Sequence, residues 1–312
     1  MRSFTPDADE RSRGSWHPST LAAAAAALHE DGVVALRQVV PRQSIAILNE
    51  KMLADIDQAT AKGRVKNDFQ GIRPPPCHPW LSADILNNDW IVAVTHAVLG
   101  DGLANIAYGS NTAYPGSAEQ HCHADGGFLF PGLAHPSVSL VVNVPLVAVD
   151  LANGATKLWP KSHLWLGAKD HSRPTASELA VFEAAHPTER AITNLGDVVI
   201  RDPRLWHCGM PNTTTRPRVM IAMIHNKRWL IGGFCAEAGS EAFFDSHPVL
   251  RHRVEFVPAP IDYLLPHHST PSWCQPRPAR KLNAPDPATP MAPTTSSVAP
   301  MAMEQAAPMA MS

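Results

Sequence analysis

Two short motifs that lie far apart in the sequence constrain this chain more than any other feature. The first contains His123 and Asp125, and the second contains His207, with Arg218 following it. In an extended strand, residues i and i+2 point to the same face, so His123 and Asp125 can reach one ion together. His207 must then arrive from another strand. The pattern therefore predicts strands that bring distant segments together around a metal.

Two imidazoles and one carboxylate form a ligand set typical of non-haem iron(II) sites. Three protein ligands on one face of an octahedral ion leave three positions, enough for a chelating 2-oxo acid and dioxygen. An arginine suits the second carboxylate of such a co-substrate, because its planar guanidinium can donate two parallel hydrogen bonds. We therefore expect His123, Asp125 and His207 to be the metal ligands and catalytic residues, and Arg218 to anchor the co-substrate.

The region from about Ile106 to Asn226 resembles the catalytic core of the phytanoyl-CoA dioxygenase family, a group of iron(II)- and 2-oxoglutarate-dependent oxygenases. The matching residues are Gln120 to Asp125, Asn153-Gly154-Ala155-Thr156, Pro160-Lys161-Ser162-His163, Gly196-Asp197, His207, Asn212 and Arg218. The family's usual Pro-Gly-Ser-His has a lysine in its second position here. This departure changes a turn and leaves the ligands intact.

The resemblance implies an enzyme that uses iron(II), 2-oxoglutarate and dioxygen to oxidise an unactivated C–H bond, with release of succinate and carbon dioxide. It also implies that Thr156 and Gln120 contact the co-substrate, although a strand threonine and a structural hydrogen bond explain these residues equally well. Because Asp125 keeps a carboxylate that related halogenases lack, hydroxylation is the expected outcome. Desaturation, ring formation, epimerisation and endoperoxide formation use the same ligands and stay open.

Other interpretations of these residues are also open. His121 shares the face of His123, and a pair of these two histidines would suit a different cupin-like metal site. Arg216 shares a face with Arg218 and is a second candidate anchor. A metal-binding cupin without turnover, or a zinc or manganese isomerase, is the alternative from another class. Oxygen-dependent formation of succinate would exclude both.

The apolar pattern predicts an all-β core with flanking helices. The expected helices cover residues 18–29, 42–62, 81–99 and 176–186. Alternating apolar residues from Val138 to Leu146 predict a half-buried strand, and 198–201 and 219–224 predict further strands. The resemblance implies a double-stranded β-helix, or jelly roll, with the N-terminal helices packed on one sheet.

The domain organisation expected from composition is simple. Residues 1–16 are polar and predict a flexible N-terminus, and 17–275 should form a single oxygenase domain whose β-helix core spans about 103–230. From residue 276 the sequence is rich in proline, alanine and methionine, which predicts a disordered tail because such a segment buries no core.

Net charge and cysteine content bear on the binding partners and on the cellular compartment of the protein. The formal net charge of the 312 residues is -2, which gives no sign of a nucleic-acid or membrane-surface partner. No apolar run is long enough to span a membrane. Five cysteines without a Cys-x-x-Cys pair predict reduced thiols and a cytoplasmic protein. Cys122 and Cys208 flank the expected metal ligands. We interpret them as small buried hydrophobic residues in preference to redox sensors.

The substrate is the least constrained part of the prediction. We expect a small hydrophobic molecule, such as an intermediate of secondary metabolism, and a homodimer is plausible. The loop from Lys62 to Trp80 carries basic residues that could bind the phosphates of a CoA thioester, and aromatic residues that could cap an apolar molecule. We therefore expect this loop to set substrate choice.

Overall fold

Strands from distant parts of the chain pair into a large sheet at the centre of the structure. The computed structural model describes residues 1–65, 72–245 and 247–264. The large sheet has seven strands, in the order β1 (Arg2–Phe4), β2 (Val33–Leu36), β7 (Val198–Arg201), β4 (Ser139–Pro145), β9 (Arg218–Asn226), β3 (Ala104–Ala113) and β11 (Arg251–His252). Neighbours in the central part, from β2 to β3, run antiparallel.

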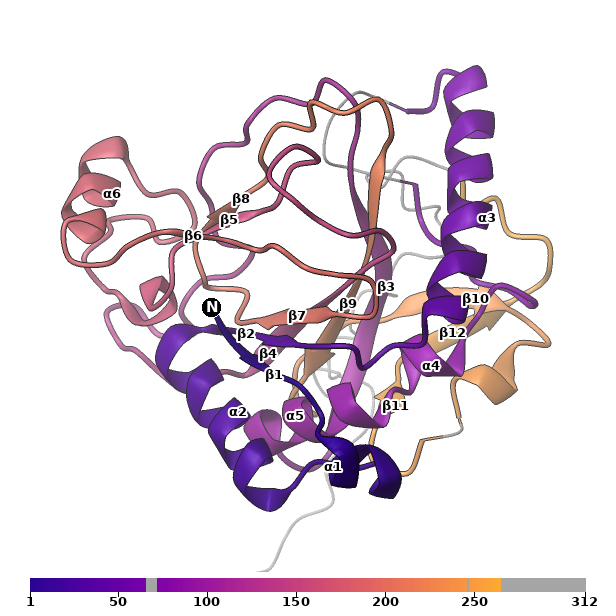
Figure 1. The fold of residues 1–312 in the computed structure, drawn as a ribbon, viewed down its shortest axis with the longest axis horizontal. Helices are drawn as coiled ribbons and strands as arrows, with labels where there is room; N and C mark the ends of the chain where they lie inside the picture. The colour runs from indigo at the N-terminus through magenta and orange to yellow at the C-terminus, as the bar shows by residue number, and fades with distance from the viewer. Residues whose placement is uncertain (66–71, 246, 265–312) are drawn as a thin grey trace, which may run out of the picture. The chain divides into compact units, whose positions relative to one another are not determined.

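Two smaller sheets complete the β-structure. Three short strands form one of them, in the order β6 (Glu189–Arg190), β5 (Lys157–Leu158) and β8 (His207–Cys208). The strands β10 (Phe234–Glu237) and β12 (Val254–Val257) pair in parallel. The three-stranded sheet lies over one face of the large sheet (Figure 1). This is a jelly-roll core, as predicted.

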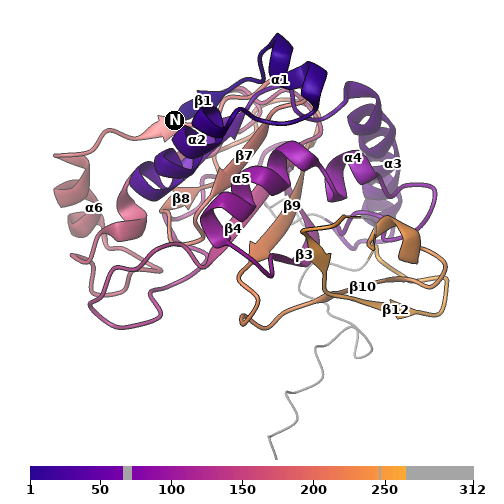
Figure 2. The same ribbon diagram turned by 90° about the horizontal axis from the view of Figure 1, so that it is seen from below.

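Helices surround the large sheet (Figure 1). They are α1 (Ala8–Arg13), α2 (Pro18–Asp31), α3 (Arg42–Ala61), α4 (Ala83–Leu86), α5 (Asp89–Leu99) and α6 (Ala176–Glu183), with short 3₁₀ turns at Ser162–Leu164 and Glu241–Phe243. Of these, α2 and α5 pack against each other, contact strands of the sheet and cover its face opposite the three-stranded sheet, whereas α6 stands apart near β6 (Figures 1 and 2). The predicted packing of the N-terminal helices on one sheet is confirmed.

In place of the single helix expected over residues 81–99, the structure has two helices, because Asn87 and Asn88 are not helical. The Asn88 side chain accepts a hydrogen bond from the backbone of Ile91 and caps α5, while its Nδ2 donates to the carbonyls of Val39 and Asp84. An asparagine side chain replaces backbone hydrogen bonds in this way and so favours helix starts over helix interiors.

The N-terminal residues form regular structure, unlike the flexible segment predicted for residues 1–16. β1 pairs in parallel with β2, and Asp7 and Glu10 form a capping box at the start of α1. Trp16 is buried and stacks edge-on against Trp90 at 4.9 Å between ring centroids. The residues that order this segment are distant in sequence. Its own polar composition therefore suggests flexibility that the structure does not show.

Strand β4 is covered on both faces, where the sequence predicts a half-buried strand. Every residue from Leu140 to Pro145 is buried. One face packs under the helices through Leu140, Val142 and Val144, which belong to the main hydrophobic core. The other face, which carries Val141 and Asn143, lines an internal cavity. Alternation in this strand therefore separates core from cavity, not core from solvent.

The interior between α2 and the sheet gives a stability prediction. Leu28 is fully buried in the main core, so Leu28→Ala should lower the free energy of unfolding by about 2–5 kcal/mol through lost burial and a residual cavity. Val181 on α6 is 66% exposed, and Val181→Ala should change it by less than about 0.5 kcal/mol. Urea unfolding followed by circular dichroism measures both values. Equal losses would contradict this assignment of the core.

Two further expectations concern the chain ends and the membrane. Within the described ranges, every helix is too short or too polar to cross a bilayer. The predicted tail from residue 276 lies outside the described residues, so that domain boundary stays a prediction.

Candidate active site

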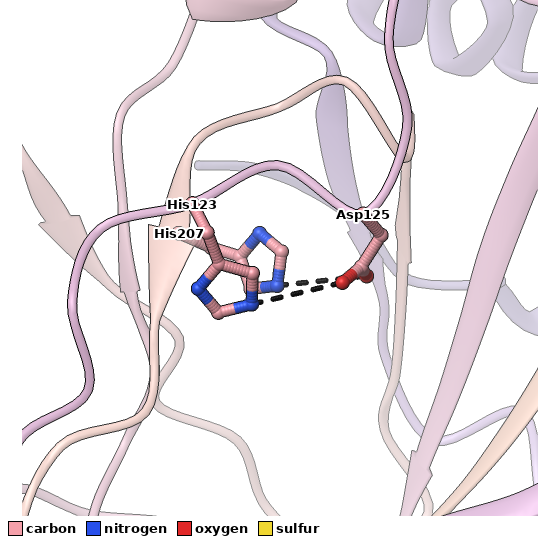
Figure 3. A group of neighbouring side chains, drawn as sticks. All are labelled: His123, Asp125 and His207. Atoms are coloured by element: carbon pink, nitrogen blue, oxygen red, sulfur yellow. Dashed lines mark ion pairs between the residues drawn. The ribbon is translucent and has the colours of Figure 1, made fainter. Parts of the chain in front are cut away.

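The three predicted metal ligands come together at one end of the small sheet. His207 begins β8, and His123 pairs with it in an isolated antiparallel bridge. The two residues exchange backbone hydrogen bonds, with N···O distances of 3.0 and 2.9 Å, which brings their ring centroids to 4.4 Å. Asp125 follows His123 in an irregular segment rather than in the expected strand. Its carboxylate faces both imidazoles (Figure 3).

The distances within this group suit a single ion. Asp125 Oδ1 lies 3.6 Å from His123 Nε2, and Oδ2 lies 3.6 Å from His207 Nε2. One ligand atom from each residue can be chosen so that all lie within 4.8 Å of one another. The Nδ1 atoms of His123 and His207 are each 2.9 Å from a backbone carbonyl, of His121 and Leu205 respectively. Because these carbonyls accept the Nδ1 proton, both Nε2 lone pairs are left for a metal.

The surroundings of Asp125 and His207 favour the protonation states that bind a metal cation. Burial opposes the negative charge of Asp125, but Arg201 and the two histidines outweigh it and hold the pKa of this carboxyl well below its usual range. Burial and the Arg201 charge lower the pKa of His207. The site therefore offers an ionised carboxylate and a neutral imidazole, the forms that bind metal.

The rival ligand and the rival anchor are both exposed. His121 lies on the surface, outside the group of possible ligands, and Arg216 also lies in solvent, before β9 begins. By contrast, Arg218 is 3% exposed. The structure therefore favours His123 over His121 as the ligand, and Arg218 over Arg216 as the anchor.

Arg218 is a buried cation that lacks an acidic partner among the described residues. Its Nη2 donates to the carbonyl of Gly154 at 3.1 Å and its Nη1 to that of Asn111 at 3.4 Å, while its Nε has no partner in this part of the chain. Burial alone lowers the pKa of Arg218 to about 10. A buried, unpaired charge is costly, so this guanidinium is placed to receive an anion.

The triad and Arg218 line one cavity of about 580 Å³ between the sheets. A smaller hollow adjoins it and shares five lining residues with it: Asn143, Thr156, Arg201, Arg218 and Met220. Within the described residues, buried polar atoms without partners gather at this hollow: Arg201 Nη1, Arg218 Nε, Asn143 Nδ2 and Thr193 Oγ1. Among the described residues, Asp125 is the only acid that lines either space. These unpaired donors and two cations fit a dianion such as 2-oxoglutarate.

The comparisons with known proteins agree with this geometry. A sequence model described as "Phytanoyl-CoA dioxygenase (PhyH)" matches residues 28–220, more than half of the chain. The chain belongs to the phytanoyl-CoA dioxygenase family. It is therefore an iron- and 2-oxoglutarate-dependent oxygenase, and the cofactors expected from the sequence are confirmed.

Two curated relatives carry dioxygenase names. Dioxygenase af480 of Aspergillus fumigatus is 29% identical over 167 residues, which are 50% of this chain and 51% of the relative. This match thus spans about half the length of af480. The iron/alpha-ketoglutarate-dependent dioxygenase ausU of Aspergillus calidoustus is 27% identical over 222 residues, 63% of this chain and 68% of the relative.

Among solved structures, EctD from S. alaskensis, crystallised with 2-oxoglutarate and 5-hydroxyectoine, has a similar fold. The TM-score is 0.55 at 21% identity, and the match covers 73% of this chain and 83% of EctD. At this identity the likeness supports the jelly-roll fold and carries no conclusion about the substrate.

The other two residues expected to contact the co-substrate in this PhyH-family chain, Thr156 and Gln120, differ in their surroundings. Thr156 lines both the cavity and the hollow, together with Arg218. Gln120 lines only the cavity, and its Oε1 accepts a hydrogen bond of 2.8 Å from the backbone of Gly209. That bond is the structural alternative considered for Gln120. Contact of either residue with 2-oxoglutarate stays a prediction.

The described residues of the loop expected to set substrate choice do not reach the cavity. None of its described residues, 62–65 and 72–80, lines the cavity. Arg64 pairs with Asp262, and the carbonyl of Ile72 accepts from Ser110, which lies on the other side of β3 from the cavity-lining Gly109 and Asn111. Residues 66–71 lie outside the described part. The described flanks of the loop therefore do not support the prediction.

The two cysteines beside the ligands give a testable chemical prediction. Burial raises the pKa of Cys122 to about 12 and that of Cys208 to about 11. Since only the thiolate reacts, both thiols should resist iodoacetamide at pH 8 in the folded protein and react after unfolding in urea. Mass spectrometry of peptides measures the labelling. Rapid labelling without urea would instead support the redox-sensor interpretation.

Proposed function

We propose that this protein hydroxylates an unactivated C–H bond of a small hydrophobic molecule at a site built from His123, Asp125, His207 and Arg218. In this proposal the first three residues bind iron(II), and Arg218, with Thr156, binds the distal carboxylate of 2-oxoglutarate. The supporting observation is the buried Arg218 guanidinium, which has no acidic partner among the described residues and lines the same cavity as the three ligands.

Each residue has a physical task in this proposal. When bound, iron and 2-oxoglutarate supply the oxidising chemistry with dioxygen, and they release succinate and carbon dioxide. The backbone bridge between His123 and His207 fixes the relative position of the two imidazoles. Arg218 and the unpaired donors of the hollow orient the co-substrate, and the surrounding sheets exclude water from it.

The walls of the cavity support a hydrophobic substrate. On the face of β9 that carries Arg218, the next residues toward the other end are Met220, Ala222 and Ile224. Leu129 and Leu230 line the same cavity. Among the residues that line it, the charged groups are confined to the two arginines and the ligands. A neutral, mostly apolar molecule therefore fits this part better than the charged end of a CoA thioester.

The first experiment tests the cofactor assignment. Iron(II) and 2-oxoglutarate, added without oxygen, should produce a charge-transfer absorption band. Admitting oxygen should then form succinate slowly, even without substrate. Absence of the band and of succinate would contradict the proposal, and oxygen-independent turnover would favour an isomerase.

The second experiment identifies the reaction. Candidate hydrophobic metabolites are incubated with the enzyme, iron(II), 2-oxoglutarate and oxygen, and the products are analysed by mass spectrometry. A gain of one oxygen is expected for hydroxylation. A loss of two hydrogens, with succinate formed in equal amount, would replace hydroxylation by desaturation or ring formation on the same ligands.

A further inference from the structure

Arg201 ends β7 beside the proposed metal ligands, and the sequence motifs do not mark it. Its side chain is 5% exposed, and its Nη2 donates to Oδ2 of Asp125. Arg201 therefore holds one oxygen of the carboxylate, while the other oxygen is left to bind a metal. A carboxylate held in this way has one orientation toward the ion instead of several.

The second terminal nitrogen of Arg201 is free to bind something else. Nη1 is buried and has no hydrogen-bond partner among the described residues. Arg201 lines both the cavity and the adjoining hollow, as Arg218 does. A buried guanidinium nitrogen without a partner costs free energy unless an acceptor is supplied. In the part of the chain that the structure describes, no carboxylate other than that of Asp125 lines the space around Arg201.

The strand register separates the two arginines. Arg201 pairs with Val141, and Val141 pairs on its other side with Ile224. Ile224 lies six residues along β9 from Arg218, a distance of roughly 20 Å in an extended strand. The backbones of the two arginines are therefore well separated, and both long side chains line the cavity, with Arg201 beside the metal ligand Asp125.

We propose that Arg201 is a second co-substrate-binding residue, which holds Asp125 with one nitrogen and the metal-side carboxylate of the 2-oxo acid with the other. The inference rests on the proposed function, because it assumes that 2-oxoglutarate binds between the triad and Arg218. One arginine then serves each carboxylate of the dianion. Arg201 also links the orientation of a metal ligand to the presence of the co-substrate.

Binding of two related acids to Arg201→Met separates this role from that of Arg218. The acids are 2-oxoglutarate and 2-oxopentanoate, which keeps the metal-side carboxylate but has a methyl group in place of the distal one. Manganese(II) replaces iron so that calorimetry measures binding without turnover. Arg201→Met should raise the Kd of both acids by about 10- to 100-fold, since each loses a charged hydrogen bond. Arg218→Met should raise the Kd of 2-oxoglutarate alone.

Two further variants serve as controls. Arg201→Lys keeps the charge but loses the fork that reaches two acceptors, so its loss should be smaller than that of Arg201→Met. Arg204 is a buried arginine of the same segment that pairs with Asp202 and lines neither space. Arg204→Met therefore tests for general disturbance, and folded protein should keep both Kd values. Thermal unfolding followed by circular dichroism checks that every variant is folded.

The outcomes are distinct. Wild-type affinity of folded Arg201→Met for both acids would overturn the inference, and so would a loss confined to 2-oxoglutarate, because Arg201 would then act at the distal end. If Arg201→Met does not fold, the comparison of Arg201→Lys with wild type decides in the same way. If the wild-type protein itself binds neither acid with manganese(II), the proposed function fails, and the inference with it.

Discussion

Arg218→Met is expected to weaken 2-oxoglutarate binding by about 100-fold or more. The substitution removes the charge-assisted hydrogen bonds to the distal carboxylate, each of which contributes about 1.5–3 kcal/mol. Calorimetry with manganese(II) gives the Kd, and succinate release gives the KM for 2-oxoglutarate. The affinity for the metal alone should stay close to that of wild type, since Arg218 does not belong to the ligand group.

A matched control and a second readout sharpen this prediction. Arg216 lies two residues earlier and is exposed, so Arg216→Met should leave the KM unchanged. Without co-substrate, Arg218→Met should also raise the unfolding temperature, because it removes a buried charge that lacks an acidic partner among the described residues. A higher KM for Arg216→Met, with normal binding by Arg218→Met, would move the anchor to the other arginine.

His123→Ala is expected to abolish measurable metal binding and turnover, whereas His121→Ala should retain both. His123 supplies one of three ligand atoms. Its removal should therefore lower the metal affinity by more than the 10- to 100-fold typical of residues that only hydrogen-bond to a ligand. His121 is exposed and offers its carbonyl, not its ring, to His123 Nδ1. That carbonyl survives the substitution, so the orientation of His123 should persist.

Electron paramagnetic resonance of added manganese(II) measures free and bound metal in both variants. Asp125→Ala and His207→Ala should resemble His123→Ala. If His121→Ala loses the metal and His123→Ala keeps it, His121 is a ligand in place of His123. That result would support the cupin-like alternative.

Much of the site could be predicted from sequence because its ligands have a local signature. His123 and Asp125 are two residues apart, and His207 is followed at a fixed distance by Arg218. The strand that begins at Arg218 also has a clear apolar pattern. Such signals depend on the chemistry of neighbouring residues and need no knowledge of the fold.

Arg201 could not be found in this way. Its contact with Asp125 joins residues 76 positions apart, and its own segment reads as an apolar strand that ends in a charged residue. A solvated arginine at a strand end gives the same pattern. Only the pairing of β7 with β4 turns this side chain toward the cavity.

Two predictions in the N-terminal part of the chain, a single helix over 81–99 and a flexible segment over 1–16, differ from the structure for a similar reason. The apolar stripe over residues 81–99 continues across Asn87 and Asn88, so periodicity alone predicts one helix. The break follows from Asn88, whose side chain bonds to Val39 in another segment. The order of residues 1–16 likewise depends on β2 and Trp90, which lie beyond any local window.

The cavity is lined partly by paired strands and partly by connections between them, and this division has an evolutionary consequence. Arg201 and Arg218 belong to paired strands, whereas Leu129 and Leu230 come from two connections that leave the sheet. Insertions in those connections can reshape the entrance while the strand register stays constant. A lineage can therefore acquire new substrates through changes near Leu129 and Leu230 that leave His123, Asp125 and the two arginines in place.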